Sequence, residues 1–387
     1  MTENTEKRRK NIAVFGCTGS IGTQTLSVAA FHEEEFRVLA LAARSSAALV
    51  ARQIEQFRPK YVGMYDEAAA KELAAQFPDI EIVSGREVDS LAALAEIDVV
   101  VNGVSGFAGL FPLLSALRAG KTVALANKES IVCGHRIVDD CLARFGGRIL
   151  PVDSEQSALF QCLSAGRRED VKSLVLTASG GMFRDFSFEE FEKVTPEMAL
   201  RHPTWNMGRK ITVDSSSLFN KGLEVMEAGW LFGFGPDEVR VFIHPQSVVH
   251  SMVEYNDGSV IAQLAKPDMR LAIQYALTWP ERLVSQLGGV SPALFSGLTF
   301  AEPDRERFPA LDLAYAAFRD GESLPIAYNS ANEVAVARFL AGELRFTSIA
   351  KCVKFAMDRM PGGRIASVSD ILELDGEARA LAGEFRQ

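Results

Sequence analysis

The chain has 387 residues, of which 48% are hydrophobic and 24% are charged, and its formal net charge is -9 at pH 7. This length exceeds what one hydrophobic core usually serves, so we expect two or three domains. The acidic balance argues against a nucleic-acid scaffold, because a phosphate backbone is bound by a basic surface. An anionic small molecule would need a local cationic pocket.

The cysteines and the N-terminus indicate the compartment. The five cysteines are not spaced as a zinc site or a redox pair, which favours reduced thiols in a cytosolic protein. The first apolar run stops at Gly16 and is too short for a secretory or membrane-spanning segment. We therefore expect a cytoplasmic enzyme without a membrane segment.

The first predicted element is a strand from Asn11 that ends at Gly16 and leads into a glycine turn. Glycines at 16, 19 and 22 precede a helical pattern that continues to Ala30. Strand, glycine turn and helix are the context of a dinucleotide fingerprint, although the spacing is G-x-x-G-x-x-G rather than G-x-G-x-x-G. Bare backbone there lets a pyrophosphate approach the helix N-terminus, where N–H groups and the helix dipole favour an anion.

The second predicted strand, Phe36 to Ala43, indicates which nucleotide is bound. Enzymes that prefer NAD usually place an acidic residue at the tip of this strand, whereas the 2′-phosphate of NADP needs a cation and hydroxyl groups. The tip reads Arg44-Ser45-Ser46 and has no acidic residue, which favours NADP. The alternative is that Arg44 is only a solvated loop residue.

Further strand-like runs alternate with alanine-rich helical patterns, which predicts a mostly parallel sheet covered on both faces. These strands are expected at 61–65, 80–83, 97–101, 122–126 and 148–152. Asn127, Lys128 and Glu129 directly follow one of them, at the edge where such sheets bind ligands. Lys128 is therefore a candidate to contact a nicotinamide or a substrate oxygen, and the alternative is a surface lysine that starts a helix.

An acidic pair follows the last of these strands. Asp153 and Glu155 stand two residues apart at the end of the apolar run 149–152. If the chain continues there as an extended strand, both carboxylates project from the same face. Two like charges that close to each other require a cation between them.

A second polar segment runs from Arg201 to Glu227. On one continuous helix Ser217, Asn220, Lys221 and Glu224 fall at spacings of three and four and share one face. Glu224 would then complete an oxygen-rich site for a hard divalent ion, while the amide and the ammonium suit a phosphate. The alternative is a capped surface helix with an ordinary Lys–Glu pair.

Two neighbouring segments carry further anion-binding groups. A strand from Val171 to Ala178 leads into Ser179-Gly180-Gly181, which offers a hydroxyl and backbone N–H groups. Ser215 is expected near the start of the following helix, where its hydroxyl would cap the helix or bind phosphate. The loop 201–208, with Trp205, is either a hydrophobic anchor or a lid that closes and excludes water.

The remaining pattern predicts strands at 239–243, 249–255 and 259–264, the last two joined as a hairpin by Asn256-Asp257-Gly258. His244 and His250 lie at strand ends, and we assign both to packing or solvent. Residues 283–309 are rich in Gly, Ser and Pro and are interpreted as a linker. About four helical segments after residue 310 predict a small helical bundle.

Six motifs occur in order: GCTGSIG, ALANKES, PVDSEQSALFQCL, TASGG, RHPTWNMGRKITVDSSSLFNKGLEVMEA and IHPQSVVHSMVEYNDGSV. Together they resemble those of the 1-deoxy-D-xylulose 5-phosphate reductoisomerase family, of the methylerythritol phosphate route to isoprenoids. The resemblance extends from about residue 11 to the C-terminal NSANEVAVARFL. It implies rearrangement and NADPH-dependent reduction of 1-deoxy-D-xylulose 5-phosphate to 2-C-methyl-D-erythritol 4-phosphate.

The resemblance also implies an α/β fold class and a homodimer. Its expected parts are a Rossmann-like NADPH-binding domain over residues 1–150, an α+β catalytic, metal-binding and dimerisation domain with a lid loop over 151–282, the linker 283–309, and a C-terminal helical domain over 310–387.

The resemblance assigns roles residue by residue. The implied ligands of Mg²⁺, Mn²⁺ or Co²⁺ are Asp153, Glu155 and Glu224, which with Lys128 and His202 form the expected catalytic set. The implied substrate contacts are Ser179, Ser215, Asn220 and Lys221 on the phosphate with His202 close by, Ser154 and Lys128 on the substrate backbone, and Trp205 as the lid indole. The implied NADPH contacts are Thr18, Gly19, Ser20, Ile21, Asn127, Glu129 and Gly208, together with Arg44, Ser45 and Ser46, where some family members have Gly-Lys-Asn.

Two rival classes are weighed against this assignment. One is another metal-using, NADP-dependent oxidoreductase, such as a homoserine dehydrogenase or the divergent reductoisomerase-like family, against which HPTWNMG and SLFNKGLE argue. The other is a catalytically inactive NADP sensor, which would keep the glycine turn and lose the acidic residues. All three acidic residues are present.

Overall fold

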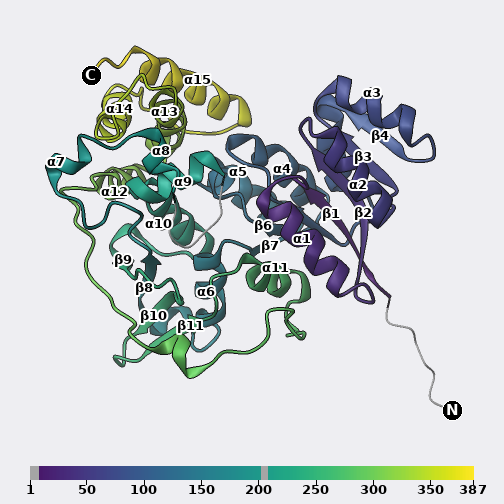
Figure 1. The fold of residues 1–387 in the computed structure, drawn as a ribbon, viewed down its shortest axis with the longest axis horizontal. Helices are drawn as coiled ribbons and strands as arrows, with labels where there is room; N and C mark the ends of the chain where they lie inside the picture. Colours follow the sequence, from purple (N-terminus) through teal and green to yellow (C-terminus); the bar gives the residue numbers. More distant parts are fainter. Residues whose placement is uncertain (1–7, 202–207) are drawn as a thin grey trace. The chain divides into compact units, whose positions relative to one another are not determined.

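The computed structural model describes residues 8–201 and 208–387 (Figure 1). Contacts divide the chain into two compact units. Among the described residues, the first unit comprises 8–130, 138–153 and 268–289, and the second comprises 131–137, 154–201, 208–267 and 290–387. Residues 268–289 were expected in the catalytic domain and the linker, but they belong to the first unit.

The first unit is built on a seven-stranded parallel sheet with the order β4-β3-β2-β1-β5-β6-β7. Most of its strands are apolar runs buried along their length, as a sheet covered on both faces requires. Each strand lies close to its expected position: β1 (Lys10–Phe15), β2 (Phe36–Ala43), β3 (Tyr61–Met64), β4 (Glu81–Ser84), β5 (Val99–Asn102), β6 (Thr122–Leu125) and β7 (Arg148–Pro151).

The strand order reverses next to β1, which pairs with β2 on one side and with β5 on the other. In open parallel sheets the ligand crevice lies outside the carboxyl ends of the strands at such a point. The loops after β1 and β5 are therefore the expected binding loops of this unit.

The helices of the first unit connect the strands, with one exception. They are α1 (Ser20–Phe31), α2 (Ala47–Phe57), α3 (Glu67–Gln76), a 3₁₀ segment (Gly85–Ala93), a short 3₁₀ turn (Phe107–Gly109), α4 (Leu110–Arg118) and α5 (Lys128–Phe145). The exception is α11 (Met269–Thr278), which packs on α1, β6 and β7. Lys10 Nζ donates to the Leu277 carbonyl at 3.0 Å, and the Arg148 guanidinium lies 4.7 Å from the Trp279 ring centroid. These contacts explain why residues 268–289 join the first unit.

The second unit contains a four-stranded mixed sheet with the order β11-β10-β8-β9. Its strands are β8 (Val171–Ala178), β9 (Val239–Ile243), β10 (Val249–Tyr255) and β11 (Val260–Leu264). β10 is antiparallel to both β8 and β11, which confirms the predicted hairpin. Gly258 has φ +86° in its turn, a conformation that glycine adopts without steric cost.

The second unit is otherwise helical. Helix α6 (Ser154–Leu163) packs on β8, β10 and β11, and α9 (Arg209–Ser217) leads into α10 (Phe219–Phe232). The four C-terminal helices expected from periodicity are α12 (Ala310–Asp320), α13 (Ser323–Leu340), α14 (Ser348–Met357) and α15 (Val368–Glu384). The shorter segments are α7 (Phe188–Phe191), α8 (Pro196–Ala199) and the 3₁₀ turns Arg168–Asp170, Pro236–Glu238 and Pro292–Phe295.

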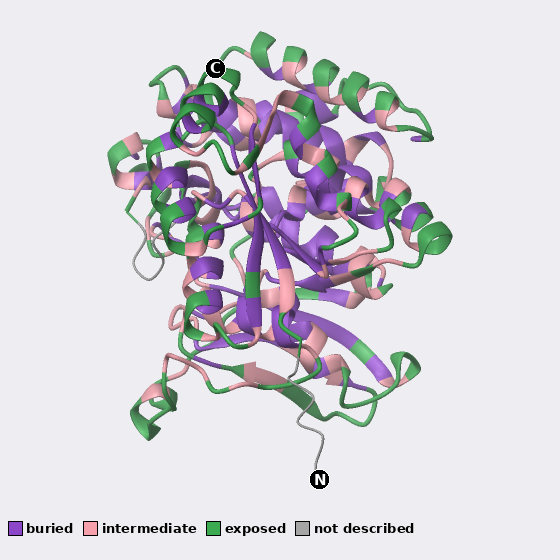
Figure 2. Cartoon of the chain, turned by 90° about the vertical axis from the view of Figure 1, so that its right-hand side faces the viewer, coloured by how far each residue is buried: buried purple, intermediate pink, exposed green. Residues whose placement is uncertain are grey.

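Burial follows the strands and the packed faces of the helices in both units (Figure 2). The core of the second unit joins side chains of β8, β9 and α10 to side chains of α12, α13 and α14. The helical bundle and the mixed sheet therefore share one apolar core. Among the helices of residues 8–201 and 208–387, none is both long and apolar enough to cross a bilayer.

Two helical glycines should respond oppositely to a methyl group. In α10 a Cβ on Gly229 would lie 2.0 Å from Phe318 Cζ, so Gly229→Ala is expected to destabilise the protein by about 1–3 kcal/mol through overpacking. In α15 a Cβ on Gly376 would meet nothing within 4 Å, so Gly376→Ala should stabilise the protein by about 0.5–1 kcal/mol. Thermal unfolding midpoints should shift in opposite directions, and an unchanged midpoint for Gly229→Ala would contradict the close helix packing.

Candidate active site

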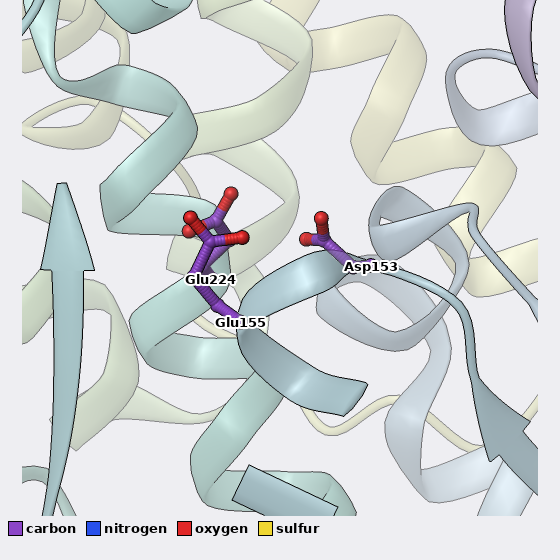
Figure 3. A group of neighbouring side chains, drawn as sticks. All are labelled: Asp153, Glu155 and Glu224. Carbon is purple, nitrogen blue, oxygen red and sulfur yellow. The ribbon is translucent and has the colours of Figure 1, made fainter. Parts of the chain in front are cut away.

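Three acidic side chains lie together at the start of α6 and on α10. One carboxylate oxygen each from Asp153, Glu155 and Glu224 lies within 4.8 Å of the other two. Figure 3 shows the three side chains. The donors are all carboxylate oxygens, which are the ligands that hard divalent cations such as Mg²⁺ prefer. The residues present therefore fit a divalent metal ion.

The expectation that Asp153 and Glu155 lie on an extended strand is wrong. Strand β7 ends at Pro151 and helix α6 begins at Ser154, so Glu155 lies in the first turn of a helix. An acidic residue in the first turn is favoured there by the helix dipole. The two carboxylates are brought close by a strand-to-helix turn rather than by strand alternation.

The expected single helix across residues 217–224 is also interrupted. Leu218 has φ +62°, a left-handed conformation that ends α9 before α10 begins. Ser217 belongs to α9, where its hydroxyl donates to the Val213 carbonyl at 2.9 Å. Asn220, Lys221 and Glu224 all lie on α10, whereas Ser217 is not part of that helix and does not share their face.

Two buried lysines balance the acidic group. Lys128 Nζ lies 2.7 Å from an Asp153 oxygen, and Lys221 Nζ lies 2.9 Å from a Glu155 oxygen and forms a second ion pair with Glu224. Burial lowers the pKa of Lys221, but the carboxylates of Glu155 and Glu224 more than offset this effect, so its pKa lies above the usual value. Lys221 therefore remains an ammonium group.

Two further polar contacts orient the carboxylates. Asn220 Nδ2 donates to Glu224 Oε1 at 2.5 Å, and the Ser154 hydroxyl donates to Glu155 Oε2 at 2.6 Å. Both residues were predicted as substrate contacts, and both lie directly beside the metal-ligand candidates.

Sequence reasoning missed the residues that tie α6 to α10. Gln156 Nε2 donates to the Glu224 carbonyl and to Glu227 Oε2, each at 3.0 Å. Gln156 and Glu227 are both buried. The available signal was the position of this amide directly after the Asp-Ser-Glu motif.

The predicted phosphate-binding residues come from three neighbouring segments. A Cβ on Gly181, which has φ +69°, would lie 2.7 Å from Ser216 Cα and 2.8 Å from the Ser215 carbonyl oxygen. The loop that carries Ser179 thus packs directly on the end of α9 that carries Ser215. Ser215 lies in the last turn of α9, not near a helix start as expected.

Two predicted residues, His202 and Trp205, lie outside the described residues. Gly208 is the N-cap of α9, and its carbonyl accepts from the Thr212 N–H and hydroxyl.

His244 and His250 are both buried, which agrees with a packing role. Burial lowers the pKa of His250, and the Glu155 carboxylate acts in the opposite direction.

The glycine turn after β1 is closely packed. Gly16 has φ +76°, and a Cβ there would lie 2.5 Å from the Gly103 carbonyl oxygen; a Cβ on Gly22 would lie 2.2 Å from the Gly16 carbonyl oxygen. Helix α1 has Gly19 as its N-cap, without a side-chain cap or an acidic residue in its first turn. This bare helix N-terminus fits an anion such as a pyrophosphate.

Thr18, Gly19, Ser20 and Ile21 line this turn and are half-buried or exposed. Arg44, Ser45 and Ser46 are exposed between β2 and α2. Their positions agree with binding loops of a parallel sheet.

Asn127 and Glu129 hold a loop that the sequence analysis did not single out. The Asn127 amide donates to the Val104 and Gly106 carbonyls at 2.8 Å each and to Glu129 Oε2 at 2.9 Å. Glu129 Oε1 in turn accepts from the Gly106 N–H at 3.3 Å. The loop at residues 103–106 follows β5 at the point where the strand order reverses, and its two glycines were the available signal.

A glycine turn at the switch point of a parallel sheet, together with a site of three carboxylates and two lysines, defines a dinucleotide-dependent enzyme that uses a divalent cation. Comparisons with known proteins specify the family. Residues 12–135 match the family model described as 1-deoxy-D-xylulose 5-phosphate reductoisomerase, residues 149–232 match its C-terminal domain model, and residues 264–381 match the DXP reductoisomerase C-terminal domain model.

Curated relatives named 1-deoxy-D-xylulose 5-phosphate reductoisomerase cover nearly the whole chain. The protein of Geotalea daltonii is 45% identical over 98% of this chain and 99% of its own length. Those of Laribacter hongkongensis and Pelotomaculum thermopropionicum are 48% and 49% identical, each over 96% of this chain and 97% of their own lengths.

Solved structures agree. The reductoisomerase of Zymomonas mobilis in complex with NADPH has a TM-score of 0.91 and 38% identity, over 97% of this chain and 98% of that chain. A reductoisomerase in complex with NADPH, fosmidomycin and magnesium has a TM-score of 0.91 and 36% identity, over 97% of each chain. This chain belongs to the 1-deoxy-D-xylulose 5-phosphate reductoisomerase family and is an NADPH-dependent oxidoreductase. The expected family and fold class are confirmed.

The acidic group should bind a divalent cation in the absence of substrate. Glu224→Gln removes one of three ligand charges and is expected to weaken Mn²⁺ binding by about tenfold or more, as followed by electron paramagnetic resonance titration. Glu254→Gln is the control, because Glu254 of β10 accepts from Lys172 and Ser173 and is outside the acidic group. Equal weakening in both variants would contradict a specific three-carboxylate site.

Proposed function

We propose that this chain converts 1-deoxy-D-xylulose 5-phosphate to 2-C-methyl-D-erythritol 4-phosphate, with NADPH as the hydride donor and a divalent cation held by Asp153, Glu155 and Glu224. The carbon skeleton rearranges to a branched aldehyde, which is then reduced. The observation that carries this proposal is the group of three carboxylates, of which Glu224 is buried, and two buried lysines in a chain of this family.

The acidic residues would hold the cation and, through it, the reacting end of the substrate. A divalent cation bound there supplies Lewis-acid polarisation of a ketone oxygen and a neighbouring hydroxyl oxygen. Solved relatives are complexes with magnesium, and we propose that Mg²⁺, Mn²⁺ and Co²⁺ serve in this chain. Lys128 and Ser154 would contact the substrate backbone. Their side chains contact Asp153 and Glu155, so they lie beside the proposed metal ligands.

The substrate phosphate would be held by Ser179, Ser215, Asn220 and Lys221. Packing of the Ser179 loop on the end of α9 supports this set, as does the position of Asn220 and Lys221 at the start of α10. Phosphate binding remote from the reacting carbons supplies binding energy that orients them. We extend the proposal to His202 beside the phosphate and Trp205 as the lid indole, on the family resemblance alone.

NADPH would bind at the switch point of the parallel sheet. The pyrophosphate would contact Thr18, Gly19, Ser20 and Ile21 at the α1 N-terminus, and the 2′-phosphate would contact Arg44, Ser45 and Ser46. Asn127 and Glu129 would act at least partly through the loop 103–106, whose carbonyl and N–H groups they hold. Gly208 is proposed as a further contact because it matches the family motif.

The decisive experiment is NADPH oxidation with 1-deoxy-D-xylulose 5-phosphate, with Mg²⁺ and after chelation. We expect oxidation only with both substrate and metal, and a smaller KM for NADPH than for NADH. Glu155→Gln should lower kcat by about a hundredfold or more, because it removes a ligand charge, while the NADPH dissociation constant stays within about twofold. A wild-type protein that binds NADPH but is inert with every metal would overturn the proposal.

We also propose that the enzyme is a homodimer that associates through β11. This strand forms one edge of the mixed sheet, and Val260, Ile261 and Leu264 on it are exposed large apolar residues. Apolar edge strands are usually covered, because they otherwise pair with other chains. Light scattering should give twice the chain mass for wild type and a lower mass for Ile261→Lys; a monomeric wild type would refute the dimer.

We place the enzyme in the cytoplasm, as the cysteine pattern predicted. All five cysteines are buried thiols that form no disulfide within the described part of the chain. Burial raises the pKa of Cys17 to about 12 and the pKa values of Cys162 and Cys352 to about 11. Reduced thiols of this kind are typical of a reducing compartment.

A further inference from the structure

The corner between α9 and α10 is a strained element that carries the proposed phosphate site. Leu218 adopts φ +62°, a left-handed conformation that is sterically unfavourable for a residue with a side chain. Such conformations persist only where surrounding contacts hold them. Ser215 lies just before this corner, and Asn220, Lys221 and Glu224 lie just after it.

Helix α13 holds the α9 side of this corner through a buried polar contact. Asn332 Nδ2 donates to Asp214 Oδ1 at 2.8 Å, and both residues are almost fully buried. The other Asp214 oxygen lies 2.7 Å from Lys210 Nζ, one turn earlier on α9. Because Asp214 directly precedes Ser215, this contact fixes the end of α9 that carries the proposed phosphate ligand.

The same helix holds the α10 side of the corner through Tyr328. Its hydroxyl donates to the Phe219 carbonyl at 3.2 Å and to the Ala310 carbonyl at 3.3 Å. The tyrosine ring also packs on the Phe219 ring, with centroids 5.0 Å apart. Phe219 is the first residue of α10, so Tyr328 contacts this helix immediately after the corner.

Glycine makes this approach possible. A Cβ on Gly222 would lie 2.0 Å from the Tyr328 hydroxyl oxygen and 2.8 Å from Ala314 Cβ. At about 3.6 residues per turn, Gly222 lies on roughly the opposite side of α10 from Asn220 and Glu224. Helix α10 therefore presents one face to the site and the other to the C-terminal bundle.

Helix α13 is itself fastened on its other side. The Ser330 hydroxyl donates to Asp375 at 2.5 Å, and Arg379 of α15 joins Asp375 and Glu333 at 2.8 and 2.6 Å. A helix anchored on both sides can transmit the position of the bundle to the site helices.

We propose that Tyr328 and Asn332 of the C-terminal bundle are positioning residues for the reaction, which hold the α9–α10 corner and thereby place Ser215, Asn220 and Lys221 on the substrate phosphate. This inference rests on the proposed function, because it takes those three residues as phosphate ligands. It gives the C-terminal bundle a role in substrate binding although its residues lie behind the site helices.

Tyr328→Phe tests the proposal, because it keeps the ring and removes only the hydroxyl. We expect KM for 1-deoxy-D-xylulose 5-phosphate to rise about fivefold or more, as the loss of hydrogen bonds that hold α10 predicts. The NADPH dissociation constant should stay within about twofold. Tyr315→Phe is the matched control, since its hydroxyl donates to the Val239 carbonyl at 2.8 Å, on β9 rather than on a site helix.

The Asp214–Asn332 contact is tested by exchange of the two side chains. Asn332→Asp places two carboxylates against each other and should raise KM, whereas the double variant Asp214→Asn/Asn332→Asp restores an amide–carboxylate pair and should recover part of the loss. Lower thermal stability in Tyr328→Phe and Asn332→Asp with KM values like those of wild type and Tyr315→Phe would overturn the proposal, since the contacts would then be structural only.

Hydrogen–deuterium exchange gives a readout independent of turnover. Tyr328→Phe should speed exchange in peptides covering residues 209–232, and Tyr315→Phe should leave these peptides unchanged. Unchanged exchange in Tyr328→Phe would count against the corner being held by α13. A wild type inert with the substrate would refute the proposed function, while the exchange data would still decide whether α13 holds the corner.

Discussion

The site depends on the balance between three carboxylates and two buried ammonium groups. Lys221 is 4% and Glu224 1% exposed, so neither charge is well solvated. A buried charge without a partner costs several kcal/mol, whereas a paired and hydrogen-bonded one is tolerated. Lys221 contacts Glu155 of α6 and Glu224 of α10 at once, so the balance requires that these helices meet at one place. The amide of Gln156, the residue after Glu155, joins the same two helices by donating to the Glu224 carbonyl and to Glu227 Oε2.

The side chains of the candidate active site lie at the ends of helices and strands. Asp153 and Glu155 flank the start of α6, Ser179 follows β8, and Lys128 begins α5. At such ends backbone groups lack partners within their own element, and side chains converge from several directions. The apolar cores behind these ends fix their positions. The C-terminal helical bundle can therefore affect the geometry of the site although it contributes no proposed ligand.

The sequence predicted the strands, the parallel sheet and the family well, because buried apolar runs, glycine turns and ordered motifs are local signals. It did not predict the helical start at Ser154 or the break at Leu218. The helix start at Ser154 was missed because a short polar segment fits the period of a strand as well as that of a helix. The break at Leu218 was missed because it places a leucine in a left-handed conformation that leucine disfavours. Local propensity cannot reveal such a break, because tertiary contacts impose it.

The same limit applies to residues that act through others. Asn127 is expected to contact a cofactor, and its amide also donates to the carbonyls of residues 104 and 106, which the sequence did not predict. Gln156 and Tyr328 gave no motif of their own, since their partners are backbone carbonyls or residues far along the chain. Helix α11 joined the first unit because its packing partners, and not its place in the chain, decide where it belongs.

The burial of the five cysteines has a consequence for how the enzyme responds to its chemical surroundings. Only a thiolate reacts readily with oxidants and alkylating reagents. Burial blocks access to all five sulfur atoms, and it disfavours the thiolates of Cys17, Cys162 and Cys352, whose pKa values it raises. A reagent reaches these sulfur atoms when the fold around them opens. Labelling of the cysteines would therefore follow the opening of the cores of the two units, and not the catalytic cycle.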